Sequence, residues 1–350
     1  MAGSSFGSSF GSSFGGAGGT GPLTLLQIIQ TVQAELGLPQ ATTVIGNTDP
    51  TTMQMYALTN RVLDELRRMH PTGWSAMQFE YDLLIPAPLT TTGNIGAQSY
   101  QITNLASTTG ITANATAVSG NGIPPAARVS AVSGTTATVT MTMESTNTSP
   151  VTGETILFAQ DTFAMPPGFD WYQNRSMWDR TNRWELLGPT SPQFDQWHKS
   201  GIVTTGPRRY FRQLGPYANQ FQIWPPPFEI TTPLQFVFEY MSLYAVNQQS
   251  GSAAAPNPPT YGQYFTNDYD QPLLDDQAIV MGVKWMFWEI KGFGSYLTLQ
   301  NRWVDYVERL IGRDGAAENL RIVREPISTL ISPNSVQDGF FPGPSGSNSG

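Results

Sequence analysis

The chain of 350 residues has no cysteine, which excludes disulfide bonds, thiolate metal sites and cysteine nucleophiles. Imidazole is nearly as scarce, because His70 and His198 are the two histidines of the sequence, too few for a histidine-rich metal site. Charged residues make up 13% of the chain, and no uninterrupted apolar run approaches the ~18 residues of a membrane helix. We therefore expect a globular chain with no membrane span and no cofactor or metal, stabilised by packing and by assembly.

Positive charge is also in short supply. The 18 basic residues include three lysines, and the formal net charge is −8. A protein that binds phosphate needs concentrated lysine and arginine, and the sequence has neither a P-loop nor a Gly-x-Gly-x-x-Gly motif that follows a predicted strand. The first basic residue is Arg61, so the sequence has no basic region typical of a secretion signal. This composition argues against a protein whose function is to bind nucleic-acid phosphates.

The two ends of the chain differ from the rest in composition. Residues 1–21 repeat Ser-Ser-Phe-Gly three times, and residues 315–350 are polar and rich in proline and glycine. Each end is either a flexible tail or a segment that orders on a partner. In the second case the docking side chains are apolar: Phe6, Phe10, Phe14, Ile327, Leu330 and Ile331.

Helical patterns occur on both sides of a long β-rich stretch. Thr24 and Gln27 form the pattern of a capping box, and Asp49-Pro50 is typical of a helix start. We predict two helices within residues 22–85. We also predict a helical hairpin whose first helix starts at Pro272 and whose second helix ends at Gly315. These parts belong to one core of residues 22–85 and 161–314.

Residues 86–160 have a different character. They are dominated by Thr, Ser, Ala, Gly and Val, and Arg128 is the one charged residue between Asp82 and Glu144. The sequence Ala-Val-Ser-Gly occurs at 117–120 and again at 131–134, as expected of short strands joined by turns. We predict a small β-module inserted into the core.

Residues 161–265 are rich in tryptophan, arginine and proline, and we expect strands at 210–214, 220–224 and 234–240. Together these patterns predict an α+β fold: an antiparallel helical-hairpin core with β-strands, an inserted β-module and extended terminal tails.

Two functional alternatives rest on particular residues. Asp170, Asp179 and Glu185 each lie beside a tryptophan, an arrangement that sugar-cleaving enzymes use, so one alternative is a tail-associated peptidoglycan hydrolase. The same residues could instead have a structural role, in which the charged side chains form an ion-pair network and the tryptophans pack in the core or an interface. The other alternative is a glycan-binding decoration protein that acts through the β-module.

A series of short motifs runs along residues 23–85 and 161–314. The N-terminal part contains Leu-Gly-Leu-Pro at 36–39 and the helix that starts at Asp49-Pro50. The remaining motifs lie at 163–169, 178–184, 187–193, 199–201, 206–212, 223–226, 238–240, 282–285 and 291–292. Each motif is weakly specific alone, but in their order and spacing they resemble the head-to-tail adaptor, or connector, proteins of short-tailed bacteriophages.

The resemblance implies a non-enzymatic virion protein at the head-to-tail junction, assembled in the host cytoplasm. Its implied partners are further copies of itself in a ring of twelve, the portal protein, a tail nozzle or tail tube protein, and tail fibres as a further candidate. DNA is expected to cross the channel without sequence-specific binding. We expect the subunit interfaces to use mainly the charged and tryptophan residues of the central stretch: Trp178, Asp179, Arg180, Arg183, Trp184, Lys199, Arg208, Arg209, Arg212 and Glu239.

Overall fold

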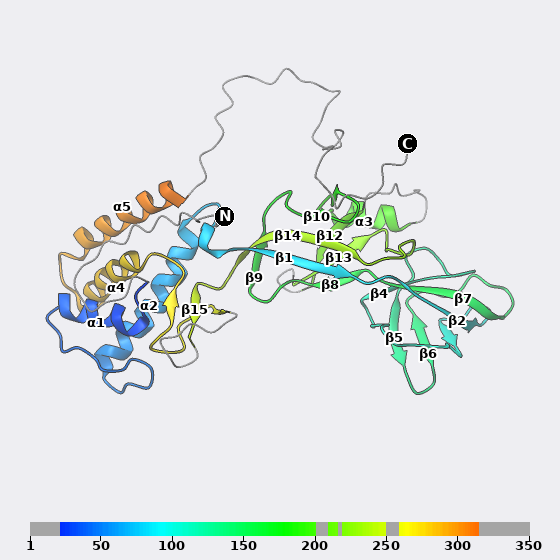
Figure 1. The fold of residues 1–350 in the computed structure, drawn as a ribbon, viewed down its shortest axis with the longest axis horizontal. Coiled ribbons are helices and arrows are strands. Elements are labelled where there is room, and N and C mark those ends of the chain that lie inside the picture. The colour runs from blue at the N-terminus through cyan, green and yellow to red at the C-terminus, as the bar shows by residue number, and fades with distance from the viewer. Residues whose placement is uncertain (1–21, 201–208, 216–218, 250–258, 315–350) are drawn as a thin grey trace, which may run out of the picture. The chain divides into compact units, whose positions relative to one another are not determined.

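The computed structural model describes residues 22–200, 209–215, 219–249 and 259–314. Within these ranges the chain forms five α-helices, one short 3-10 helix and four antiparallel sheets, which confirms the predicted α+β class (Figure 1). The chain divides into two compact units. Unit 1 combines the described residues up to Gln78 with those from Met241 onward, and unit 2 takes Phe79–Tyr240. The docking residues predicted in the two tails lie outside the described residues.

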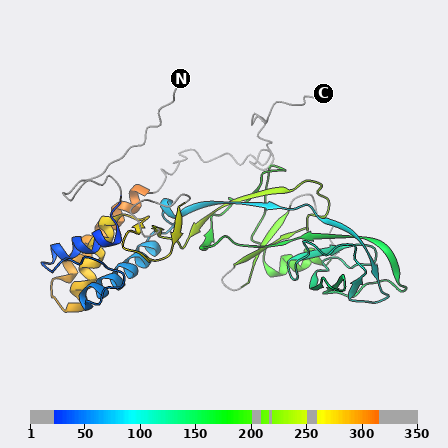
Figure 2. The ribbon, with the colours of Figure 1, turned by 60° about the horizontal axis from the view of Figure 1, so that its bottom comes forward.

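Unit 1 contains four helices, which Figure 2 shows gathered together. Their bounds are Leu25–Glu35 for α1, Pro50–Met69 for α2, Asp276–Lys291 for α4 and Tyr296–Asp314 for α5. The predicted capping box is confirmed, because the Thr24 hydroxyl accepts a hydrogen bond from the Gln27 amide and the Gln27 side chain accepts one from the Thr24 amide. At the start of α2, the Asp49 carboxylate accepts a hydrogen bond from the Thr52 amide and caps the helix.

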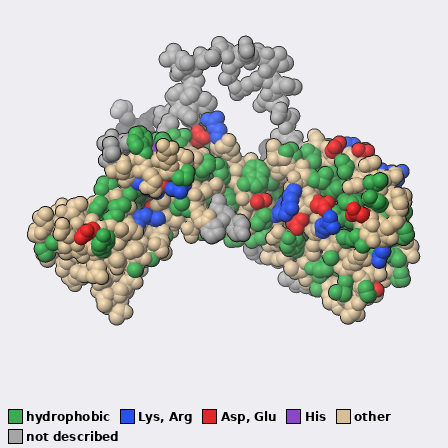
Figure 3. Space-filling view, turned by 180° about the vertical axis from the view of Figure 1, so that it is seen from behind, with side chains coloured by type: hydrophobic (Ala, Val, Ile, Leu, Met, Phe, Trp, Pro, Cys, Tyr) green, Lys and Arg blue, Asp and Glu red, His purple; other side chains and the backbone are tan. Residues whose placement is uncertain are grey.

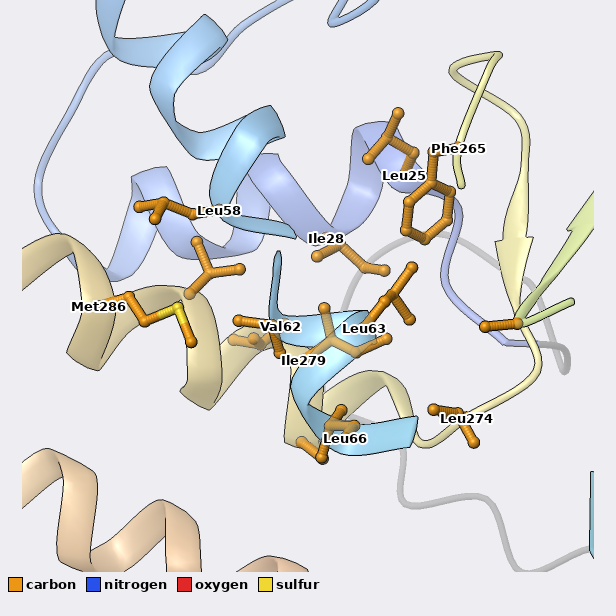
Figure 4. Close-up of a cluster of buried hydrophobic side chains, with 14 of the residues drawn as sticks. Leu25, Ile28, Leu58, Val62, Leu63, Leu66, Phe265, Leu274, Ile279 and Met286 are labelled. Atoms are coloured by element: carbon orange, nitrogen blue, oxygen red, sulfur yellow. The ribbon is translucent and has the colours of Figure 1, made fainter. Parts of the chain in front are cut away.

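The core of unit 1 forms where α2 and α4 pack antiparallel. Leu58 lies beside Met286 and Leu66 beside Ile279, as Figure 4 shows. Between these pairs is Gly282, where an added Cβ would come within 2.6 Å of Val62. A glycine is therefore required for this close approach of the two helices. The α4–α5 hairpin is held by Trp303, whose indole donates a hydrogen bond to the Ala278 carbonyl at 2.8 Å.

The predicted start of the third helix at Pro272 is wrong. Pro272 lies in strand β17, where it pairs with Val246, and α4 begins at Asp276 because the Asp275 carboxylate caps it through the Ala278 amide. Strand β17 belongs to a three-stranded sheet in the order β16-β15-β17. The strand bounds are Thr260–Gly262, Val246–Gln248 and Gln271–Pro272. The 3-10 helix is Ser75–Met77.

Unit 2 contains three sheets, and two of them share one apolar core. The first has the order β1-β14-β10-β11, with β9 also paired to β14. The second has the order β12-β13-β8, and the short helix α3 is Pro192–Lys199. The bounds are Gln78–Ile85 for β1, Phe169–Tyr172 for β9, Trp178–Asp179 for β10, Trp184–Glu185 for β11, Leu234–Ser242 for β14, Thr162–Ala164 for β8, Tyr210–Leu214 for β12 and Gln220–Trp224 for β13. Strands β12, β13 and β14 occur where the sequence predicts them.

The remaining sheet has six strands in the order β4-β7-β2-β3-β6-β5. Its two outer strands approach each other, because the Val118 amide donates to the Ala127 carbonyl at 3.0 Å and the Asn114 amide donates to the Val129 carbonyl at 2.8 Å. The sheet therefore curls around its own apolar core. The strands are Leu89–Ile95 (β2), Gln101–Thr103 (β3), Thr116–Ser119 (β4), Val129–Ser133 (β5), Thr138–Met141 (β6) and Val151–Gln160 (β7).

Candidate interaction surface

Strands β10 and β11 form a hairpin at one end of the five-stranded sheet. Trp178 pairs with Glu185 and Asp179 with Trp184, while β10 pairs on its other side with β14 through Val237 and Phe236. We call residues 178–185 the tryptophan hairpin. It contains five of the predicted interface residues: Trp178, Asp179, Arg180, Arg183 and Trp184.

The two tryptophans of the hairpin point to opposite faces. Directly opposed residues of an antiparallel pair project from the same face, and successive residues project from opposite faces. Trp178 therefore shares a face with Glu185 and Val237, and Trp184 shares the other face with Asp179. Trp178 is 41% exposed and Trp184 is 37% exposed. The hairpin thus presents one partly exposed indole on each side.

Asp179 fixes the turn of the hairpin from within. The Asn182 amide donates to Asp179 Oδ1 at 2.9 Å, and the Asn182 side chain donates to Oδ2 at 2.8 Å. Arg209 Nη1 lies 3.8 Å from Oδ2, and the Asp179 side chain is 4% exposed. The turn also holds Arg183 at a φ of +61°, a conformation uncommon for this residue type. Asp179 therefore has a structural role within the hairpin.

Arg180 attaches the hairpin to β14 by its backbone and leaves its side chain at the surface. Its amide donates to the Gln235 carbonyl at 2.8 Å, and the Gln235 amide donates to the Thr181 hydroxyl at 2.9 Å. The guanidinium forms an ion pair with Glu80 at 3.1 Å, with both side chains 50% exposed. Exposed ion pairs contribute about 0–1 kcal/mol to stability. Breaking the Arg180–Glu80 pair, so that either side chain could bind another protein, therefore costs little stability.

Arg128 of the β-module binds a buried carboxylate that follows β7. Arg128 Nη2 donates to Asp161 Oδ1 at 2.7 Å and to the Thr162 hydroxyl at 2.6 Å. The Asp161 side chain is 1% exposed, and its Oδ2 accepts a hydrogen bond from Gln222 Nε2 at 2.7 Å. Burial raises the pKa of Asp161 above its ordinary value, although Arg128 and the hydrogen bonds from Gln222 and Thr162 oppose this effect. The module is thereby joined to β8 and β13.

The same series of contacts continues from Gln222 to α3. Lys199 Nζ donates to Gln222 Oε1 and to Asp195 Oδ2, both at 2.7 Å. Arg212 Nη1 donates to Asp195 Oδ2 at 2.8 Å, and the Asp195 side chain is 4% exposed. We call this connected set the polar chain: Arg128, Asp161, Gln222, Lys199, Asp195 and Arg212.

The structure separates the predicted interface residues into two groups. The exposed group is Trp178, Arg180, Arg183, Trp184 and Glu239. The second group lies largely inside unit 2, with Lys199 and Arg212 in the polar chain and Arg209 beside Asp179. Burial lowers the pKa of Arg209, and Asp179 and Glu229 oppose this effect. Arg208 lies outside the described residues.

The carboxylates behind the hydrolase alternative occupy unlike environments. Asp179 is buried and hydrogen-bonded to Asn182, Glu185 forms an ion pair with Arg175 at 3.4 Å, and Asp170 is exposed on β9. Asp179 and Glu185 project from opposite faces of the hairpin, because neighbouring strand positions alternate. This arrangement gives no support to a shared catalytic role for these two carboxylates.

Sequence reasoning missed α3 and the residues around it, although Ser191-Pro192 is a typical helix start and Ser191 does cap the helix through the Phe194 amide. His198 of α3 is 7% exposed and packs against Phe194, Trp197 and Tyr210. Among the described residues, neither ring nitrogen of His198 has a hydrogen-bond partner. A buried polar group without a partner lowers stability.

Replacing His198 with phenylalanine is therefore expected to raise the free energy of unfolding by about 1 kcal/mol, because two unpaired buried nitrogens are removed. Urea unfolding followed by circular dichroism measures the change. The matched control is His70→Phe, since His70 Nδ1 accepts from the Thr72 amide and Nε2 lies 3.7 Å from Asp314. We expect the control variant to have a lower free energy of unfolding than the parent. If the free energy of unfolding changes in the same direction in both variants, the prediction is wrong.

Two comparisons with known proteins found no relative of this chain. No family model matches the sequence, and a search of curated proteins finds no match. In the described ranges no helix has the length and apolarity to cross a membrane. The same ranges contain no group of three or more His, Asp or Glu side chains placed to hold a metal ion.

Proposed function

We propose that this protein is a non-enzymatic structural protein of a phage virion, a head-to-tail adaptor that forms a ring of twelve copies between the portal and the tail nozzle and lets DNA pass. The observation that carries the proposal is the tryptophan hairpin. Tryptophan and arginine are enriched at the centres of protein interfaces, and here a partly exposed tryptophan faces outward on each side of a turn with exposed Arg180 and Arg183.

A ring subunit needs two unlike surfaces that contact the neighbours on either side. A hairpin with an indole on each face suits insertion between two elements of a neighbouring copy. The resemblance of the ordered motifs to connector proteins supports the same proposal. In this scheme the helical hairpins form the body, the β-module is an insertion, and the two terminal segments clasp neighbouring components.

The surface of the β-module fits a protein contact better than a nucleic-acid contact. Residues 86–160 contain three charged residues, and Arg128 is bonded to Asp161 inside the unit, which leaves Glu144 and Glu154. In Figure 3 the module is accordingly drawn almost entirely in tan and green. Proteins that bind DNA rely on lysine and arginine at the phosphates. We therefore place the module away from the DNA channel.

Negative-stain imaging of the purified protein, alone and mixed with the portal protein of the same virion, tests the proposal. We expect rings with twelve-fold symmetry, formed either free or on the portal. A protein that stays monomeric and does not bind the portal at micromolar concentrations of both would refute the assignment. A zymogram on peptidoglycan is the companion measurement, and clearing by the protein would favour the hydrolase instead.

A further inference from the structure

The turn between α4 and α5 carries an exposed apolar patch. Ile290 is 51% exposed, Phe293 is 50% exposed and Leu297 is 54% exposed. We call these three residues the turn patch. The ring of Phe293 packs against Trp288 at a centroid distance of 5.4 Å, so the patch continues into the apolar part of unit 1. Large apolar side chains that remain exposed near one another are candidates for an interaction site.

The conformation of the turn is well determined by the sequence. Gly292 ends α4 in the left-handed region with a φ of +75°, and its amide donates to the Glu289 carbonyl. The Phe293 amide donates to the Trp288 carbonyl at 3.1 Å, and the Tyr296 amide donates to the Phe293 carbonyl at 3.2 Å. The turn patch is thus presented by a hydrogen-bonded turn at the end of the α4–α5 hairpin (Figure 1).

We propose that the turn patch is covered by the C-terminal part of the same chain, with Ile327, Leu330 and Ile331 as the contacting side chains. These apolar residues recur at i, i+3 and i+4, the spacing with which an amphipathic segment anchors on an apolar surface. The inference does not rest on the ring proposed above, because it concerns a contact within one subunit.

The length of the chain permits this contact. Helix α5 has 19 residues, so the turn patch and the end of α5 at Asp314 are separated by about 28 Å at ~1.5 Å per residue. Ile327 follows Asp314 by about 13 residues, which span about 43 Å when extended. The segment therefore reaches back along α5 to the patch with length to spare.

The same chain is favoured over a second copy as the occupant. Residues 315–326 connect this segment to α5, and a short tether gives a segment an effective concentration in the millimolar range, whereas another copy contributes only its own concentration in solution. Three apolar side chains form a small contact surface. Its binding therefore depends more on the effective concentration that the tether provides than the binding of a large interface would. The subunit thereby masks its own apolar patch, and a partner that binds the turn patch has to displace the segment.

Cysteine cross-linking tests the contact directly, because the chain has no cysteine of its own. The test variant carries Thr298→Cys, next to Leu297, and Thr329→Cys, between the apolar anchors, so that the anchors themselves are kept. The control variant carries Glu308→Cys with Thr329→Cys. Thr298 and Glu308 are both exposed on α5. Disulfide formation under mild oxidation is followed on non-reducing gels, with two mass-tagged forms of the chain mixed to separate bonds within a chain from bonds between chains.

The two variants give opposite results for a docked and an undocked segment. An undocked segment closes the shorter loop to Glu308→Cys, about 21 residues against about 31, roughly twofold faster. A docked segment should instead form the bond at Thr298→Cys at least tenfold faster than at Glu308→Cys, within one chain. This preference should disappear when Ile327, Leu330 and Ile331 are all replaced with serine.

Three outcomes would overturn the inference: a preference for Glu308→Cys, a Thr298→Cys bond that forms mainly between chains, or a preference that survives the three serine substitutions. The second outcome would assign the turn patch to a neighbouring copy.

Discussion

Replacing Arg128 with methionine is expected to lower the free energy of unfolding by about 3–5 kcal/mol, the usual cost of leaving one partner of a buried ion pair alone. The Asp161 side chain is 1% exposed and would lose its only ion-pair partner among the described residues. Methionine keeps most of the length and apolar contact of the arginine stem, so the loss reports on the charge. Urea unfolding measured at pH 7 gives the change.

A second substitution separates the unpaired charge from lost packing. Asp161→Asn removes the carboxylate and keeps the shape, so the double variant with Arg128→Met should recover part of the lost stability. Arg180→Met is the matched control, because Arg180 forms an exposed ion pair with Glu80 and its replacement should cost less than about 1 kcal/mol. An Arg128→Met variant as stable as this control would show that the buried pair does not hold the module to β8 and β13.

The stability of Arg128→Met relative to the parent should also change with pH, in a direction that the pKa of Asp161 predicts. Burial raises the pKa of Asp161 above its ordinary value of 3.8, so the folded protein binds this proton more tightly than the unfolded chain does. The contribution of Asp161 to stability is therefore largest below pH 3.8 and falls as the pH rises through the pKa of the folded state. Without Arg128, which opposes the rise, the pKa should rise further. The stability gap between Arg128→Met and the parent should therefore narrow as the pH is lowered from 7.

Local signals explain why much of the fold was predictable. The Thr24–Gln27 capping box and the Asp49-Pro50 helix start depend on residues within one turn, and both are confirmed. The start of α4 was misplaced because Pro272 suits both a first helical turn and a short strand. The choice depends on Val246, which is distant in sequence and pairs with Pro272.

The polar chain was not predictable for the same reason. Asp161 meets Arg128 across 33 residues and Gln222 across 61, and these pairings exist only after the sheets form. One signal was available, because Arg128 is isolated in a stretch almost free of charge. An isolated arginine in such a stretch suggests that it has a specific partner, and this partner is the buried Asp161. Asp179 shows the opposite case, since an acidic residue between surface tryptophans and arginines is turned inward by Asn182.

The double variant Trp178→Ala/Trp184→Ala is expected to fold and to lose assembly. Central interface tryptophans contribute about 2 kcal/mol or more each, so removing both should weaken subunit association roughly a thousandfold. Both side chains are more than one-third exposed, and Asp179, which fixes the turn, is retained. Sedimentation velocity of the free protein and co-purification with the portal measure the loss.

Trp197→Ala is the matched control, because Trp197 is 51% exposed and belongs to α3, not to the hairpin strands. It should assemble as the parent does. Charge reversal at Arg209 is a poor substitute for these variants, since its guanidinium is 12% exposed beside Asp179 and its reversal would disturb the hairpin from within. If the double variant forms rings and binds the portal with the affinity of the parent, the tryptophan hairpin is not the subunit interface, and the proposed function loses the observation that carries it.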